Sequence, residues 1–263
     1  MKVWILQTGE PLQIDSTGLR PMRAINLSNA LIERGHDVVL WSSDFDHNTK
    51  SHRYGSKQAI KIHKNLTIKL IESSGYRSHF GLRRLIDHFE LGWNLKKMLK
   101  TESPPDIAFI GYPPIEPAWI LLRWLSRTRT PSVLDVKDAW PDIFLNKLPS
   151  IMGRFGKILL LPYFFMMKSS FKNATGLTSI TEDFLDWSLG KVLRQRASSD
   201  LVVPLTSLDI VFSENEIRDA EAFWDSLGVR DEGKNRIYFV GTLNDVFDFE
   251  SAISAAQNLE VDF

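Results

Sequence analysis

The sequence predicts an α/β fold, a Rossmann-like doubly wound parallel sheet with helices on both faces. Three observations lead to this prediction. Short apolar runs alternate with longer amphipathic stretches along most of the 263 residues. The short runs are continuously apolar, which is typical of parallel strands that are buried on both faces. Gly, Pro and Asp separate the segments, and the handedness of βαβ units makes a doubly wound sheet the simplest topology.

Seven strands are expected from the apolar runs, at 2–7, 37–42, 66–71, 106–110, 132–136, 176–180 and 201–204. Helices are expected between them, at 20–34, 82–99, 115–127 and from 182 onward. Gly35 follows the first helix, and glycine commonly ends a helix because it adopts left-handed backbone freely. Lysines at the end of the second helix interact favourably with the negative end of its dipole.

The chain from residue 205 onward has a different organisation. A charged helix is expected at 213–227, followed by a strand at 236–240 and a helix at 249–259. One β-α unit cannot bury its own apolar face. We therefore expect a Rossmann-like domain over 1–204, and a linker helix with the first unit of a truncated second domain over 205–263. The alternative is that this unit extends the first sheet. Exposed apolar residues there would favour a homodimer.

Composition excludes several classes of function. Lys plus Arg and Asp plus Glu both number 32, and this balance argues against nucleic acid as the main partner. There is no cysteine, and the six histidines lack the spacing of metal ligands, so we expect no metal and interpret the histidines as surface or turn residues. No apolar run reaches the roughly 18 residues that span a bilayer. The short apolar N-terminus is unlike a signal peptide, so we expect a cytoplasmic protein.

The main candidate site follows the fifth predicted strand, in the segment that contains Asp138, Trp140 and Asp142. Open α/β sheets bind ligands at the carboxyl ends of their strands. Asp138 is the candidate catalytic group, because a carboxylate there can orient or deprotonate a substrate hydroxyl. Trp140 could stack on a sugar face and Asp142 could bind substrate. The alternative is that Trp140 belongs to the core and that the aspartates cap the next helix.

Five further residues are candidate ligand contacts. Gly18 would let backbone amides approach a phosphate, which Arg20 could pair with; the alternative is a flexible connection and a solvated helix face. Thr181 and Glu182 follow the sixth strand and could bind substrate, although Thr181 also suits a helix cap. Gly241 could face a ligand phosphate or form a plain β-α turn.

An apolar segment from Ile158 to Met167 lies between Lys157 and Lys168. In one interpretation it dips into a membrane interface, where its basic flanks contact anionic lipid. In the other it is a helix of the core.

Several of these segments resemble the N-terminal half of a family 4 glycosyltransferase of the GT-B fold. The most specific is Asp-x-Trp-Pro-Asp at 138–142, and others are Ser-Thr-Gly-Leu-Arg-Pro at 16–21, Arg-Gly-His at 34–36 and Phe-Val-Gly-Thr-Leu at 239–243. Similar enzymes build bacterial O-antigen, capsule or exopolysaccharide. The resemblance implies a retaining transfer from a nucleotide sugar to a sugar or lipid-linked acceptor, without metal or cofactor, at the inner face of the membrane.

The sequence departs from that family in lacking a complete donor domain and its Glu-x7-Glu element. We therefore expect this chain alone to be inactive as a glycosyltransferase. The alternative is a non-enzymatic Rossmann-like module that binds an acceptor or a partner. An oxidoreductase is disfavoured, because no dinucleotide fingerprint follows the first strand.

Overall fold

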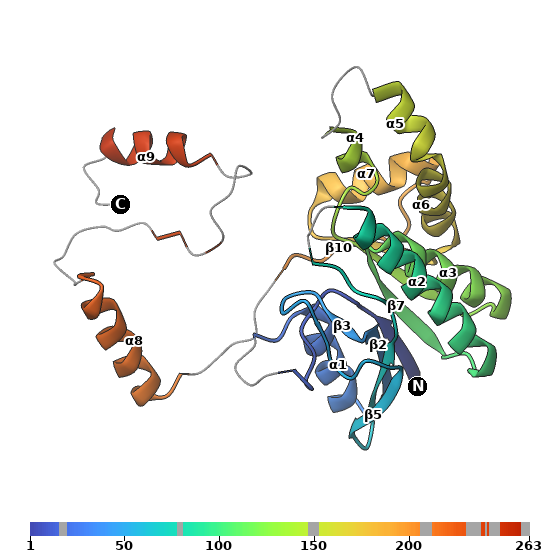
Figure 1. Cartoon of the computed structure of the whole chain (residues 1–263), viewed down its shortest axis with the longest axis horizontal. Coiled ribbons are helices and arrows are strands. Elements are labelled where there is room, and N and C mark those ends of the chain that lie inside the picture. The colour runs from blue at the N-terminus through green and yellow to red at the C-terminus, as the bar shows by residue number, and fades with distance from the viewer. Residues whose placement is uncertain are drawn as a thin grey trace. The chain divides into compact units, whose positions relative to one another are not determined.

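The computed structural model describes residues 1–15, 20–77, 81–146, 153–205, 212–229, 238–239, 241 and 248–258. The chain divides into two compact units, Met1–Leu208 and Asp209–Phe263. In the first unit, helices cover a central sheet (Figure 1). Each unit is described by itself.

The sheet of the first unit has eight strands in the order β10-β9-β8-β7-β1-β2-β6-β5. Seven of them run parallel, and β5 pairs with β6 in the antiparallel direction. The predicted Rossmann-like α/β fold with a mainly parallel sheet is therefore confirmed. The strands are β1 (Lys2–Leu6), β2 (Asp37–Ser43), β5 (Gln58–His63), β6 (Leu66–Ile71), β7 (Ile107–Tyr112), β8 (Ser132–Val136), β9 (Gly176–Ser179) and β10 (Leu201–Val202). A separate two-stranded ribbon consists of β3 (Phe45–Asp46) and β4 (Ser51–His52).

The helices of the first unit lie mostly where the sequence predicts them. The first begins at Arg23, later than expected, because Arg20 precedes a proline and helical backbone is disfavoured at that position. Gly35 has the left-handed φ of 77° expected beyond the end of this helix. The helices are α1 (Arg23–Glu33), α2 (Leu82–Met98) with the 3-10 turn η1 (Leu99–Thr101), α3 (Ile115–Thr128), α4 (Asp142–Asn146), α5 (Gly153–Leu159), α6 (Leu161–Asn173) and α7 (Glu182–Val192).

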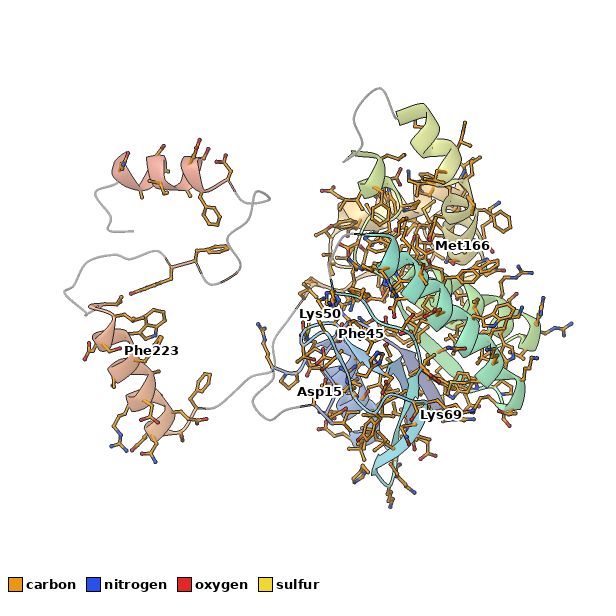
Figure 2. The ribbon with its side chains drawn as sticks, in the orientation of Figure 1. Asp15, Phe45, Lys50, Lys69, Met166 and Phe223 are labelled. Carbon is orange, nitrogen blue, oxygen red and sulfur yellow. The ribbon has the colours of Figure 1, made fainter. Side chains whose placement is uncertain are left out.

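Successive residues of each strand point to opposite faces of the sheet, and this alternation produces two cores. Trp4 and Leu6 of β1 join the core formed with α2, α3, α6 and α7. Ile5, between them, joins the core formed with α1. Side chains fill the space between the sheet and its helices (Figure 2). The strands are therefore buried on both faces, as their continuously apolar sequences require.

The winding of the sheet reverses at β1. This strand pairs with β2 on one side and with β7 on the other. The chain first adds β2 and β6 in one direction, then returns to β7 and adds β8, β9 and β10 in the other. Such a reversal leaves a crevice outside the carboxyl ends of the two central strands, and open α/β sheets bind ligands there. The topology therefore indicates a binding site beyond β1 and β7.

The second unit contains α8 (Glu214–Ser226) and α9 (Phe249–Asn258). A capping box starts α8: the backbone N–H of Glu216 donates to Ser213, and that of Ser213 donates to the Glu216 carboxylate at 2.8 Å. The predicted strand at 236–240 lies mainly outside the described residues. Phe239 and Ile253 are about half exposed, at 45% and 46%. The homodimer stays a prediction.

Candidate functional site

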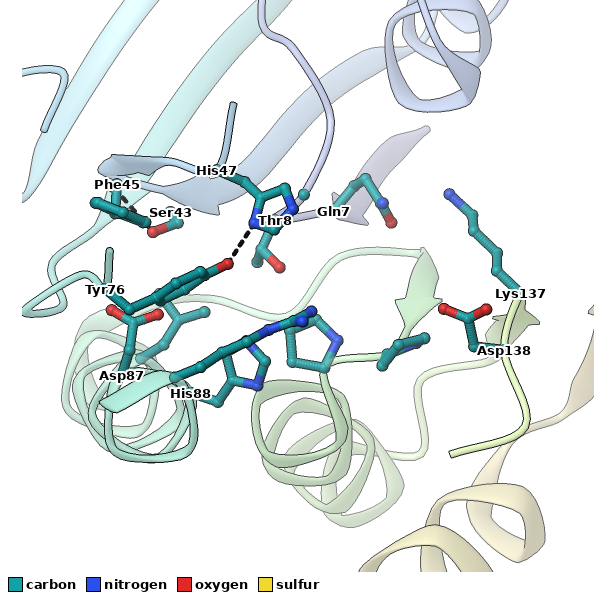
Figure 3. Close-up of a pocket in the computed structure, with 15 residues that line it drawn as sticks. Gln7, Thr8, Ser43, Phe45, His47, Tyr76, Asp87, His88, Lys137 and Asp138 are labelled. Atoms are coloured by element: carbon teal, nitrogen blue, oxygen red, sulfur yellow. Dashed lines mark hydrogen bonds between the residues drawn. The ribbon is translucent and has the colours of Figure 1, made fainter. Parts of the chain in front are cut away.

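A cleft of about 200 Å³ lies at the carboxyl ends of the central strands, where the winding reverses. Figure 3 shows polar side chains on its opposite sides, from the strand ends and from α2. The residues that line it are Gln7, Thr8, Gly9, Ser43, Phe45, His47, Tyr76, Arg84, Asp87, His88, Leu91, Pro113, Pro114, Lys137 and Asp138.

Gln7 lies at the end of β1, and a glycine on the neighbouring strand makes room for it. A Cβ atom at Gly111 of β7 would lie 1.7 Å from Oε1 of Gln7. Any other residue at this position would displace the Gln7 amide. An amide group both donates and accepts hydrogen bonds, so it can contact a ligand hydroxyl in either role.

The loop after β1 is fixed by a buried glutamate. One carboxylate oxygen of Glu10 accepts from the backbone N–H of Ala24 at 2.8 Å, at the start of α1. The other forms an ion pair with Lys137. Lys137 also lies 3.9 Å from Asp135, which is fully buried. These contacts join the strand ends of β1 and β8 and hold the ammonium group at the edge of the cleft.

Asp135 has a structural environment rather than a ligand-facing one. Its Oδ1 atom accepts from Arg23 at 2.7 Å and from Thr178 at 2.8 Å. Burial raises the pKa of Asp135, and the charge of Arg23 counteracts this effect. The pair ties α1 to β8.

Asp138 lies where β8 leaves the sheet, and solvent reaches it from the cleft. The surrounding protein raises the pKa of its carboxyl group by desolvation, while the charges of Arg84 and Lys137 lower it. A carboxylate with a raised pKa, close to two cations, can accept a proton from a bound hydroxyl.

The helix α2 supplies one wall of the cleft. The Arg84 guanidinium lies 5.0 Å from the ring of Trp140 and 5.6 Å from that of Tyr76. Burial lowers the pKa of His88 to about 3, so its imidazole is neutral at physiological pH. Asp87 accepts from the backbone N–H of Gly75 at 2.7 Å, and burial raises the pKa of this carboxyl.

Residues that follow β2 and β6 complete the cleft. His47 shares a hydrogen bond with the hydroxyl of Tyr76 (Figure 3). Burial raises the pKa of Tyr76, so its hydroxyl keeps its proton. The ammonium of Lys50 lies 4.8 Å from the same ring. The sequence offered no signal for this wall, because helix and loop side chains meet here only through tertiary packing.

The structure places the residues of the 138–142 segment in different surroundings. Only Asp138 lines the cleft. Trp140 is 7% exposed and packs edge-on against Phe144 at 4.6 Å between ring centroids. Asp142 is the first residue of α4 and forms an ion pair with Lys191 at 2.8 Å. Substrate contacts by Trp140 and Asp142 stay predictions.

The other candidate residues lie apart from the cleft lining. Arg20 is exposed, and Gly18 lies outside the described residues. Thr181 caps α7 by accepting from the backbone N–H of Phe184, and Glu182 pairs with Arg196 at 2.8 Å. Gly241, in the second unit, is exposed. No group of three or more potential ligands in the described residues is arranged to hold a metal ion.

The segment from Ile158 to Met167 is partly surface and partly core. Leu159 is 78% exposed and Phe165 is 64% exposed, whereas Met167 is fully buried. Among the described helices, none is long and apolar enough to cross a membrane. Peripheral membrane contact stays a prediction.

Comparisons with known proteins find matches among solved structures alone. No protein-family model matches the sequence, and no curated protein matches it. Among solved structures, the Burkholderia thailandensis nucleoside kinase in complex with inosine aligns with a TM-score of 0.37 and 12% identity, over 87% of this chain and 85% of that chain. At these values the similarity transfers neither an activity nor a ligand to the present chain.

The prediction of a glycosyltransferase was wrong on these findings. No glycosyltransferase family model matches the chain, and a solved structure that aligns with it is that of a nucleoside kinase. The resemblance depended on short motifs. Arg-Gly-His and a carboxylate after a strand are compatible with many Rossmann-like proteins, because one fold hosts many functions. The non-enzymatic alternative gains no support either.

Proposed function

We propose that the chain is an enzyme that binds a small hydroxylated molecule in the cleft and transfers a group to one of its hydroxyls. The position of Asp138 in the cleft is the observation that carries the proposal. Its carboxylate is reached by solvent at the carboxyl edge of the sheet, has a raised pKa and lies near Arg84 and Lys137. It would accept the hydroxyl proton while the substrate oxygen bonds to the transferred group, and the bond between that group and the leaving group of an activated donor would break, with the electron pair going to the leaving group. The two cations would stabilise the negative charge that develops.

The size and lining of the cleft support a small polar substrate. Its volume of about 200 Å³ is below the ~300–1,000 Å³ of drug-sized sites, so one small molecule fits. Gln7, Thr8 and Ser43 provide hydrogen-bonding groups, and the Tyr76 ring provides an apolar surface. A molecule with several hydroxyl groups matches this mixture of donors, acceptors and ring surface.

The experiment compares Asp138→Asn with Asp183→Asn. Small polyols, sugars and nucleosides are screened for binding by calorimetry, and each ligand that binds is then incubated with a panel of activated donors. Asp138→Asn is expected to keep substrate affinity within a few fold and to lose about 10²- to 10⁴-fold in turnover, which is the usual contribution of a general base. Asp183→Asn changes an exposed aspartate of α7 outside the cleft lining and should retain activity. Equal turnover in the two variants would refute the role of Asp138, and a panel without any binding ligand would refute the proposed substrate class.

A further inference from the structure

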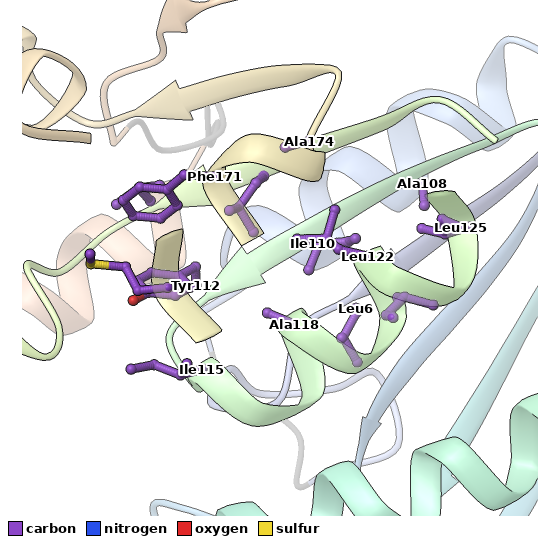
Figure 4. Close-up of a cluster of buried hydrophobic side chains, with 14 of the residues drawn as sticks. Leu6, Ala108, Ile110, Tyr112, Ile115, Ala118, Leu122, Leu125, Phe171 and Ala174 are labelled. Atoms are coloured by element: carbon purple, nitrogen blue, oxygen red, sulfur yellow. The ribbon is translucent and has the colours of Figure 1, made fainter. Parts of the chain in front are cut away.

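The helices α2 and α3 border a second groove, which shares no lining residue with the cleft. Its volume is about 450 Å³ and its lining is mostly apolar. Ala118, Leu122 and Leu125 of α3 face the core (Figure 4). The opposite side of α3 therefore remains available to the groove. The lining residues are Phe89, Trp93, Lys96, Leu99, Lys100, Glu116, Trp119, Ile120, Arg123, Trp124, Arg127 and Met166.

An exposed apolar stripe on α2 continues the groove. Leu82, Ile86, Phe89 and Trp93 recur every three to four residues and share one face of the helix. Each is at least 49% exposed. Large apolar side chains gathered on a surface mark binding sites, whereas scattered ones need no explanation. The stripe gives an elongated apolar ligand a surface to lie on.

Four cations surround one end of the groove. The ammonium of Lys96 lies 5.0 Å from the Trp93 ring, and the guanidinium of Arg123 lies 4.9 Å from the Trp119 ring. Lys100 and Arg127 also line this part. Among the ion pairs of the described residues, none involves any of the four. The positive charge is therefore available to an anionic group.

A buried carboxyl group lies at the other end. Glu116, in the first turn of α3, is 3% exposed and lines the groove. Its own backbone N–H and the hydroxyl of Tyr163 interact with it, yet neither carboxyl oxygen has a hydrogen bond of ordinary geometry. A buried polar group of this kind usually has a partner. At 1.5 Å per residue, Arg123 lies about 10 Å and Arg127 about 16 Å further along the helix axis.

We propose that this groove binds an elongated anionic amphiphile. Its anionic end lies among the four cations, its apolar body lies on the tryptophans and the α2 stripe, and a hydroxyl on the body reaches Glu116. The charge of the rim, the apolar lining and the carboxyl group without a regular partner each match one part of such a molecule. A free amphiphile and a membrane lipid both have this chemistry.

The test uses ω-hydroxydodecanoate below its micelle concentration, with binding to the full chain measured by calorimetry. Dodecanol, which lacks the charge, is the ligand control. Lys100→Gln with Arg127→Gln removes two rim cations, and Lys61→Gln with Lys64→Gln removes two exposed cations elsewhere. The rim variant is expected to bind about tenfold more weakly, because it lacks two exposed charge contacts with the anionic end of the ligand. The control variant should bind like the wild type.

Glu116→Leu tests the hydroxyl contact. The wild type should bind ω-hydroxydodecanoate at least as tightly as dodecanoate, and the variant should reverse this order because the buried hydroxyl then lacks a partner. Retention of the chain on vesicles of anionic phospholipid, in addition to binding of the soluble acid, would identify membrane lipid as the source; binding of the soluble acid alone would identify a free amphiphile. The proposal is overturned by the absence of saturable binding to the soluble acid, by equal affinity in the rim and control variants, or by a ligand order that Glu116→Leu leaves unchanged.

Discussion

Replacing Glu116 with glutamine should change how stability depends on pH. Burial raises the pKa of the Glu116 carboxyl from its usual 4.5 to about 7. The backbone and the hydroxyl of Tyr163 favour the charged form and offset part of this effect, while the charge of Asp87 adds to it. The folded chain therefore retains a proton that the unfolded chain releases.

The sign follows from proton linkage. Below pH ~4.5 both states carry the proton, so Glu116 adds no pH dependence. Between pH ~4.5 and ~7 the unfolded state ionises first, and the free energy of unfolding falls as the pH rises. Above pH ~7 both states are ionised and the loss is complete. At about 1.4 kcal/mol per unit of pKa, the total is roughly 3 kcal/mol.

The assay is urea unfolding followed by tryptophan fluorescence, for the wild type and Glu116→Gln at several pH values across this range. The variant lacks the titration, so its stability relative to the wild type should increase by about 3 kcal/mol from the acidic to the alkaline side. A constant offset from the new amide does not affect this slope. His88, whose pKa burial lowers to about 3, titrates in both proteins and cancels. A difference that stays flat, or that shrinks as the pH rises, would refute the reasoning.

Three further predictions concern helix packing, the core and a buried ion pair. Gly92→Ala should cost about 1–3 kcal/mol of stability, because its new methyl group would lie 3.0–3.3 Å from atoms of α3. The control Gly190→Ala has nothing within 4 Å of the new methyl group and should stabilise α7 by up to about 1 kcal/mol. Thermal denaturation compares the two variants, and equal effects would contradict the close approach of α2 and α3. Phe171→Ala removes a fully buried ring and should cost about 3–5 kcal/mol of stability in urea unfolding, while Phe165→Ala, at an exposed position, should cost far less. Similar losses in the two variants would show that Phe171 does not belong to the core. Arg23→Gln leaves its buried partner Asp135 with only the more distant Lys137 as a counter-charge and should cost up to about 3–5 kcal/mol at neutral pH. A loss below about 1 kcal/mol would argue against the Arg23–Asp135 pair.

The sequence predicted those elements whose pattern is set by burial. Strands such as 66–71 are apolar throughout because helices cover both faces, so their position could be read directly. The strand Gln58–His63 was missed because it lies at the sheet edge, is largely exposed and has a polar composition. The helix Leu161–Asn173 has apolar residues around most of its circumference, so its apolar run did not distinguish core from membrane surface.

The sequence predicted where the candidate site lies but not which residues form it. Asp138 could be placed at the cleft, because residues after a parallel strand lie at the binding edge of the sheet. Arg84 and His88 could not, since the partner of a helix face is decided by tertiary packing. All six histidines were interpreted as surface or turn residues, yet His88 is buried at 4% exposure. A histidine inside an amphipathic helix looks the same in sequence whether it faces water or a wall of the cleft.

The reversal at β1 also affects when the cleft can form during folding. The β5–β6 hairpin closes over a short turn, and such hairpins form in roughly 1–10 μs. On the other side of β2, β1 must instead capture β7, and the hydrogen bond between the Lys2 amide and Asp106 joins residues that are 104 apart. Closing a loop of that length is entropically costly and slows folding. During synthesis, the β1–β2 half of the sheet exists before the strand that creates the crevice has been made, so ligand binding at this cleft reports on completed long-range assembly rather than on local structure.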